Sequence, residues 1–161
     1  MDKEFHTVRG YQLLHQNHKM LTPAMEDYLE MVYRNIGEEG YVRMSELADK
    51  LNVRASSATK MIQKLGELGF IKYQRYGMIK VTEAGKEVGE YLLRRHSAVE
   101  QFLSLIGITD QLLVETELIE HYVSAGTLRH VEILNQFFFS YPELLRRFRG
   151  YVSAQMKAGA E

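Results

Sequence analysis

The sequence predicts a mainly α-helical fold in which a small β-hairpin follows a pair of helices and precedes a longer helical region. Three observations predict it: two amphipathic segments joined by a tight turn, two short apolar segments separated by QRYG, and helical periodicity that resumes at Thr82. A chain of 161 residues with 45% hydrophobic content is long enough for one ordinary domain or two small ones.

The first predicted helix begins at a clear start signal. Thr22 can act as the N-cap, and Pro23 occupies the first helical position, where its missing N–H costs nothing. Apolar residues then recur at helical spacing to Ile36, and Gly37 and Gly40 end the segment. We therefore expect a helix over about residues 23–36, preceded by a polar arm, residues 1–20, that lacks clear periodicity.

Two further helices and a hairpin follow. Ser45 is predicted to cap SELADKLN, a VRAS turn follows, and SSATKMIQKLGELG forms the second helix, with Gly69 as its stop. FIKY and MIKV, joined by QRYG, are predicted strands. A helix-turn-helix followed directly by a hairpin is the layout of a winged helix.

The second half of the chain is predicted to be entirely helical. A long helix runs from Thr82 to Gly107, and Asp110 is predicted to cap the next one, which contains VETELIEHYVS. TLRHVEILNQFFF and the segment after Pro142 are further helices. The run of three Phe residues, 137–139, is too apolar for a solvated helix and indicates a subunit or domain interface.

Composition narrows the classes of protein and of site. Without cysteine, disulfides and thiolate metal sites are excluded, so a metal would be held by His, Asp, Glu or backbone oxygens. We find no apolar run long enough for a membrane span and no signal peptide, and we therefore expect a cytoplasmic protein. The chain has a net charge of −1, but its two parts differ: residues 41–81 carry a local net charge of +5 and residues 82–124 a local net charge of −5. This asymmetry suggests that the two halves attract different partners.

The basic half predicts a DNA-binding surface. In a helix-turn-helix the second helix reads the major groove, and here it offers charged and hydrogen-bonding side chains of the kinds that contact phosphates and base edges. The hairpin adds further basic residues; a solvated helix face is the alternative interpretation. The predicted contacts to double-stranded DNA are Arg54, Ser56, Ser57, Thr59, Lys60, Gln63, Lys64 and Arg75.

The acidic half contains candidate metal ligands. On a helical wheel Glu117, Glu120 and His121 share one stripe with Leu113 and Val114, which could face inward. Asp27 and Glu30, three apart, share one side of the first helix, and His96 lies among apolar residues of the long helix. Taken alone, the carboxylates could equally be a solvated face, and a lone His on an apolar face is more often a core residue than a ligand.

Four segments together carry a family resemblance. TPAMEDYLEMVY, SSATKMIQKL, RRHSAVEQFL and ELIEH, in this order and spacing, resemble the manganese-responsive branch of the diphtheria-toxin-repressor family of metal-dependent transcription regulators. The resemblance covers about residues 21–124. It implies a winged-helix DNA-binding domain over residues 21–82, a helical metal-binding and dimerisation domain over residues 83–161, and a paired-metal site. The implied ligands are Asp27, Glu30, His96, Glu117, Glu120 and His121.

The resemblance also bears on the identity of the metal. Iron-responsive members have Met and Cys where this chain has Asp27 and Glu117, and carboxylates in place of sulfur favour a hard ion such as Mn²⁺. We expect one or two Mn²⁺ ions per subunit, with Fe²⁺ or Zn²⁺ less suited as the effector. The predicted function is a homodimeric repressor of metal-uptake genes, in which metal binding orders the dimer for a palindromic operator.

The two alternatives are an enzyme and a different kind of winged-helix regulator. A dinuclear enzyme is disfavoured because the chain has neither the two Glu-x-x-His pairs of the bundle di-iron enzymes nor HExxH, GxSxG or phosphate-loop patterns. A winged-helix regulator that responds to Fe²⁺ or Zn²⁺ is the second alternative. One that responds to a non-metal ligand, or that binds DNA constitutively, would require the six ligand-type residues to be coincidental.

Overall fold

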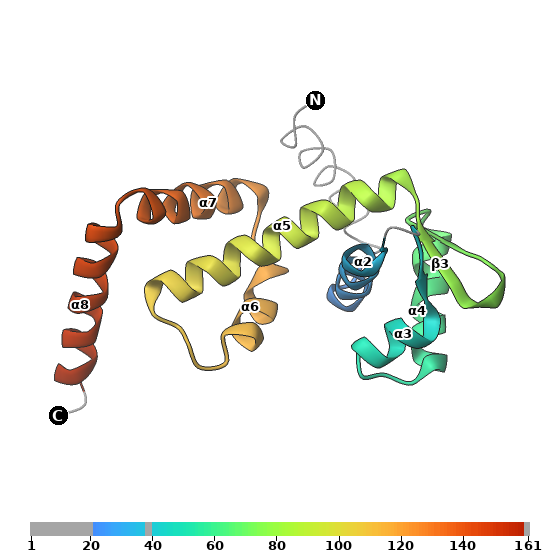
Figure 1. Ribbon diagram of the computed structural model, residues 1–161, viewed down its shortest axis with the longest axis horizontal. Helices are drawn as coiled ribbons and strands as arrows, with labels where there is room; N and C mark the ends of the chain where they lie inside the picture. The colour runs from blue at the N-terminus through green and yellow to red at the C-terminus, as the bar shows by residue number, and fades with distance from the viewer. Residues whose placement is uncertain (1–20, 38–39, 160–161) are drawn as a thin grey trace. The chain divides into compact units, whose positions relative to one another are not determined.

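The computed structural model describes residues 21–37 and 40–159, and it divides into two units, one that ends at Leu93 and one that begins at Arg94. The division falls inside the helix α5 (Glu83–Ile106). The predicted fold class is confirmed: a helix-turn-helix with a small sheet comes first, and an all-helical region follows (Figure 1). The predicted N-terminal arm, residues 1–20, lies outside the described residues.

In the described part of the first unit, three helices precede the hairpin: α2 (Pro23–Asn35), α3 (Met44–Lys50) and α4 (Ala55–Glu67). Thr22 caps α2 as predicted, and its hydroxyl accepts a hydrogen bond of 3.3 Å from the backbone N–H of Met25. The predicted cap at Ser45 is wrong. Ser45 lies inside α3, because the helix begins one residue earlier and follows the extended Arg43, whose side chain makes no capping hydrogen bond.

The end of α4 follows the predicted stop signal. Gly69 has a φ of +81°, which places the chain in the left-handed conformation that only glycine adopts easily. The N–H of Phe70 then donates to the carbonyl of Leu65 at 3.1 Å, and both side chains are buried. The helix stop therefore also directs the chain into the strand that follows.

Three short strands form the wing: β1 (Val42–Arg43), β2 (Ile71–Tyr73) and β3 (Met78–Val81). They make one antiparallel sheet in the order β1-β3-β2, in which Lys72 pairs with Lys80. The predicted hairpin is confirmed. Its connection contains a single 3-10 turn, with φ near +63° at Tyr76 and +73° at Gly77.

The first turns of α5 pack closely on the rest of the first unit. A Cβ added at Gly85 would lie 2.0 Å from the carbonyl oxygen of Phe70, and one added at Gly89 would lie 2.7 Å from the Tyr33 side chain. Helix α4 packs against α2, α3 and β2 (Figure 1). Apolar side chains of these elements, of β3 and of α5 form the core. Its fully buried members are Leu29, Val32, Leu47, Ala58, Ile62, Leu65, Ile79, Val88 and Leu92.

The second unit continues from α5 into α6 (Leu112–Glu120), α7 (Ala125–Ser140) and α8 (Pro142–Ala158). The predicted cap at Asp110 is wrong, because Gln111 occupies the N-cap of α6 with a φ of +57° and without a side-chain hydrogen bond. The left-handed backbone conformation of Gln111 changes the direction of the chain at the start of α6 without a side-chain cap. Ser124 caps α7 and accepts a hydrogen bond from the N–H of Thr127 at 3.2 Å.

The last two helices carry much exposed apolar surface. Phe137 and Phe139 are 43% and 59% exposed, while the Phe138 ring packs 5.6 Å from that of Phe148. Helix α8 has no buried residue. Among the described helices, none combines the length and the apolar character that crossing a membrane would need.

Candidate metal centre and DNA interface

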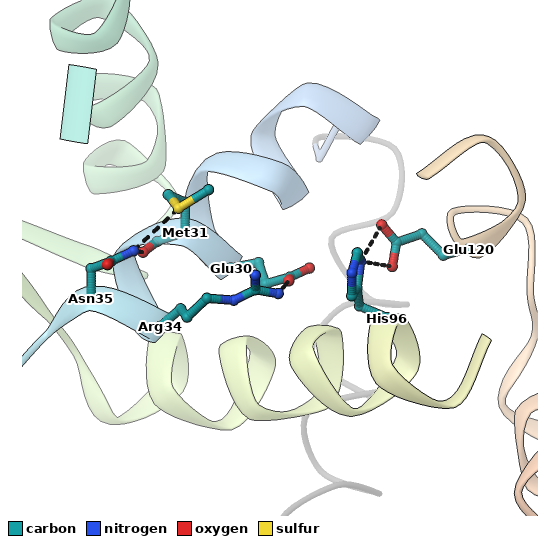
Figure 2. Close-up of polar contacts among 6 residues, drawn as sticks. All are labelled: Glu30, Met31, Arg34, Asn35, His96 and Glu120. Atoms are coloured by element: carbon teal, nitrogen blue, oxygen red, sulfur yellow. Dashed lines mark hydrogen bonds and ion pairs between the residues drawn. The ribbon is translucent and has the colours of Figure 1, made fainter. Parts of the chain in front are cut away.

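The centre of the candidate metal site in the second unit is a buried pair. His96 on α5 is 7% exposed and Glu120 at the end of α6 is 1% exposed. The Nδ1 atom of His96 lies 3.3 Å from Oε1 and 3.2 Å from Oε2 of Glu120 (Figure 2). Because a carboxylate only accepts, the His96 Nδ1 is the donor, so in the neutral ring the proton lies on Nδ1 and Nε2 carries a lone pair.

One oxygen of this pair lacks a hydrogen-bond donor. Among the described residues, Glu120 Oε2 is buried and accepts no properly directed hydrogen bond, since Nδ1–H points to Oε1. Burying a carboxylate oxygen without a donor or a cation costs on the order of several kcal/mol, because the charged group loses its hydration. The donor set therefore fits a divalent cation, which would neutralise the carboxylate.

His121 is next to the buried pair in the chain and in space. It occupies the C-cap of α6, and one of its ring nitrogens lies within 4.8 Å of a Glu120 oxygen. Its Nδ1 lies 3.2 Å from Nη2 of Arg95, a residue that is only 2% exposed. Sequence reasoning did not single out Arg95; its position directly before the candidate ligand His96 was the available signal.

The predicted inward stripe of α6 is wrong in part. Leu113 and Val114 are 54% and 48% exposed, and Glu117 is exposed, whereas Thr116 and Glu120 are buried. A helical wheel could not decide this, because apolar residues occur on both faces of this nine-residue helix. The structure thus buries Glu120, leaves His121 half-buried and leaves Glu117 on the surface.

The two candidate ligands in the first unit both come from α2. Glu30 is 8% exposed and accepts a hydrogen bond of 2.5 Å from Arg34 one turn later, as Figure 2 shows. Asn35 fixes the end of this helix, because its amide donates to the Met31 carbonyl at 2.7 Å (Figure 2). Glu26, which the sequence did not single out, is also buried, at 7% exposed.

The predicted DNA-reading face of α4 is exposed opposite the core. Ala58, Ile62 and Leu65 are fully buried, and the other face presents five of the predicted DNA contacts, namely Ser56, Ser57, Lys60, Gln63 and Lys64.

Three other predicted contacts differ from this group. Thr59 is half-buried and donates to the Ala55 carbonyl at 2.8 Å, so its hydroxyl already serves the backbone. Arg54 is exposed at the N-cap position. The Arg75 side chain lies outside the described part of the chain.

Two family models match the chain in succession. Residues 20–79 match the N-terminal DNA-binding domain of the iron-dependent repressors, and residues 82–146 match the metal-binding and dimerisation domain of the same repressors. The chain is also 39% identical over 131 residues to the HTH-type transcriptional regulator MntR of Listeria welshimeri, covering 81% of this chain and 92% of that protein.

The chain belongs to the diphtheria-toxin-repressor family of metal-dependent transcriptional regulators. A second relative in this family is MntR of Geobacillus thermodenitrificans, 42% identical over 120 residues that cover 74% of this chain and 85% of that protein. The family resemblance predicted from the sequence is thereby confirmed, and so is the prediction that the chain is not an enzyme, since these relatives are transcriptional regulators.

Solved structures of the family agree in fold. The manganese regulator SloR superposes with a TM-score of 0.63 at 25% identity over 73% of this chain, and IdeR of T. acidophilum with a TM-score of 0.58 at 27% identity over 66%. The chain spans about half the length of these two structures, 55% and 51%. As a member of the diphtheria-toxin-repressor family, the protein binds DNA, responds to a divalent metal and forms a homodimer.

Proposed function

We propose that the protein is a manganese-responsive repressor that binds a palindromic operator when Mn²⁺ is bound. The observation that carries this proposal is Glu120, a buried carboxylate with one oxygen lacking a hydrogen-bond donor, beside His96 in the matched metal-binding domain. The donor chemistry supports Mn²⁺, because oxygen and imidazole ligands suit a hard ion and the chain has no cysteine. A structural relative, SloR, is itself described as a manganese regulator.

Six side chains are proposed to hold the metal. The second unit supplies His96, Glu117, Glu120 and His121, of which Glu117 would have to turn from the surface. That Asp27 and Glu30 of α2 complete the site, and that it holds two ions, stay predictions. When bound, the metal would supply positive charge that neutralises carboxylates. His96 would be one of the residues that hold it, and Glu120 fixes the orientation of the His96 ring through Nδ1.

The proposed switch follows from these charges. Without a cation, carboxylates from α2 and from the acidic half would repel one another and favour a looser arrangement of the two domains. An ion that binds better to the ordered arrangement shifts the population toward it. We propose three parts of the chain: an arm (1–20), a DNA-binding domain (21–82) and a metal-binding and dimerisation domain (83–161). Each subunit of a dimer then carries one recognition helix.

The proposed operator contacts follow from α4. Its exposed Lys and Gln side chains would enter the major groove, and the two α4 helices of a dimer would read half-sites about 34–36 Å apart or a multiple of that. Such a dimer reads a palindrome, since its two-fold symmetry is matched by that of the DNA.

The metal response is tested by measuring operator affinity with Mn²⁺, Fe²⁺ or Zn²⁺ and with chelator. We expect the tightest binding with Mn²⁺ and at least a tenfold loss with chelator. Equal affinities in Mn²⁺ and chelator would contradict the switch, and a larger response to Fe²⁺ or Zn²⁺ would contradict the choice of metal.

The metal site is tested with a matched pair of histidine variants. His121→Ala should abolish the Mn²⁺ response of operator binding while the dimer stays folded. His130→Ala should keep it, because His130 lies exposed on α7 with its Nδ1 against the Gly126 carbonyl. A normal Mn²⁺ response in His121→Ala would remove His121 from the site.

The DNA face is tested by salt dependence. Each neutralised phosphate adds about 0.9 to the slope of log affinity against log salt concentration. Lys60→Ala should lower the slope by about that amount, whereas Lys86→Ala should leave it unchanged, since Lys86 lies on α5 paired with Glu83. Equal slopes for the wild type and Lys60→Ala would exclude a phosphate contact at Lys60.

A further inference from the structure

A buried arginine lies against one of the proposed metal ligands. Arg95 is 2% exposed, although arginine is almost never fully buried unless it is paired. Its Nη2 lies 3.2 Å from Nδ1 of His121, and both residues belong to the second unit. The neighbouring Arg94 has a different role, because it forms a two-point ion pair with Glu132 on α7.

The direction of the Arg95–His121 hydrogen bond follows from the donor alone. A guanidinium has five N–H donors, no acceptor, and keeps its charge at every accessible pH. His121 Nδ1 must therefore accept, which places the proton of the neutral ring on Nε2. In this geometry neither nitrogen of His121 can bind a metal, because the Nδ1 lone pair is engaged and Nε2 carries the proton.

His96 is in the opposite condition. Its Nδ1 donates to Glu120, so in the neutral ring Nε2 carries no proton. Of the two histidines in this unit that we propose as ligands, His121 is therefore the one whose unprotonated nitrogen accepts a hydrogen bond from a guanidinium.

We propose that Arg95 competes with the metal for His121 and thereby sets the metal concentration at which the regulator responds. The inference rests on the proposed function, since it takes His121 to be a ligand. Before His121 can bind the ion, the guanidinium has to give up the Nδ1 lone pair. Because the guanidinium is also a positive charge next to a ligand, it opposes a divalent cation in the same place.

The competition is tested by calorimetric titration of the full-length metal-free protein with Mn²⁺. Arg95→Met, which keeps the length and the apolar stem, should bind Mn²⁺ about tenfold to a hundredfold more tightly, the range that the loss of one charge-assisted hydrogen bond represents. Arg95→Lys, which keeps a charge and a donor, should lie closer to the wild type. An Mn²⁺ affinity of Arg95→Met equal to or weaker than that of the wild type would contradict the competition.

Arg94→Met is the matched control. It removes the same charge at the adjacent position, from a side chain that forms an ion pair with Glu132 on α7. We expect its Mn²⁺ affinity to stay within about threefold of the wild type, a free-energy change below that of one hydrogen bond. If both variants tighten binding equally, the effect is general charge removal and the specific role of Arg95 is excluded.

A measurement on the unmodified protein keeps the inference testable even if Arg95→Met folds poorly. In the metal-free wild type, the ¹⁵N chemical shifts of the His121 ring should report a proton on Nε2 and a lone pair on Nδ1. A proton on Nδ1 would overturn the inference.

The two proposals fail in different ways. If His121→Ala keeps wild-type Mn²⁺ affinity, His121 is not a ligand, and both the ligand assignment and the inference fail. If His121→Ala loses Mn²⁺ affinity but Arg95→Met does not gain it, only the competition by Arg95 is wrong.

Discussion

The two units bury different kinds of side chain. In the described residues of the first unit, the buried side chains are apolar except for Glu26 and Glu30 on α2, and the apolar ones come from nearly every element, from Leu29 on α2 to Val88 on α5. In the second unit several buried side chains are polar, while α6 and α7 expose apolar side chains such as Leu118 (64%) and Ile133 (50%). The polar ones are Arg95, His96, Thr116, Glu120 and Asn135.

This difference teaches where each unit obtains its stability. The first unit removes its own apolar surface from water, which stabilises it without a ligand. The second unit buries charges that call for a counter-ion and exposes apolar surface that calls for a covering partner. The stability of the second unit should therefore depend on metal and on protein concentration, whereas that of the first should depend on its packing.

The largest effect is expected from overpacking the first unit. In Gly85→Ala the new Cβ would lie 2.0 Å from the Phe70 carbonyl oxygen and 2.6 Å from Val81 Cγ1, and the Phe70 backbone cannot move without disturbing the sheet. We expect a loss of about 3 kcal/mol in the free energy of unfolding, measured by urea denaturation.

Gly66→Ala is the matched control for that substitution. Gly66 lies inside α4, and a Cβ there would have an ordinary contact of 3.6 Å with the Ile71 carbonyl oxygen. The variant should be more stable by about 0.5–1 kcal/mol, because alanine restricts the unfolded chain. Equal stabilities of the Gly85 and Gly66 variants would show that α5 does not pack as closely as described.

The next effect concerns the dependence of the second unit on metal. At a Mn²⁺ concentration of about one hundred times Kd, the wild type should gain about 2.7 kcal/mol of stability. Glu120→Gln should gain almost none, because the amide removes the buried charge that the ion neutralises, and its metal-free stability should not fall. Thermal unfolding with and without Mn²⁺ measures both quantities.

Glu115→Gln removes the same charge from the same helix, but at an exposed position. It should respond to Mn²⁺ as the wild type does. If Glu120→Gln gained as much stability from Mn²⁺ as the wild type, the buried carboxylate would have a structural role and would not be a metal ligand.

A smaller effect is expected at the exposed apolar surface of α7, which we predict to be covered by the second subunit. Ile133→Glu places a charge there and should weaken dimerisation by about 2 kcal/mol, roughly thirtyfold, in sedimentation equilibrium. Tyr73→Glu on β2, where the native side chain is 47% exposed, should leave the dimer unchanged. Normal dimerisation of Ile133→Glu would place the subunit interface on another surface.

Most of the fold could be predicted because its signals are local. Thr22 with Pro23 fixes the start of α2 through its hydroxyl and the proline ring, and Gly69 and Gly107 end helices through their backbone conformation; the structure places helix ends at all three. The predictions that Ser45 and Asp110 act as N-caps were wrong, because the presence of a capping residue does not by itself fix where a helix begins. Each is a good capping residue, but the observed N-cap is Arg43, two residues before Ser45, in one case and Gln111, one residue after Asp110, in the other. Neither Arg43 nor Gln111 makes a side-chain capping hydrogen bond.

The site could be predicted only in part, because its members meet through tertiary packing. The family motifs pointed to His96 and Glu120, and the structure brings them together. The exposure of Glu117, the burial of Glu26 and the contact of Arg95 with His121 depend on which face of each helix is covered. When apolar residues lie on two faces of a helix, the periodicity of the sequence does not specify which face is covered.

The smallest effect on stability is expected at Glu83, an exposed carboxylate of the first unit that contrasts with the buried Glu120 of the second. Glu83, fully exposed in the first turn of α5, is paired with Lys86 at 2.9 Å, and the hydrogen bond and charge of that lysine lower the pKa of the carboxyl below its ordinary value. A carboxyl whose folded pKa is lowered contributes stability above the unfolded pKa, near 4.5, and loses it as pH falls through the folded value. Glu83→Gln should therefore be slightly less stable than the wild type at pH 7, and the difference should vanish in acid and shrink in high salt. A difference that stayed constant through the acid range would belong to the helix and not to the charge.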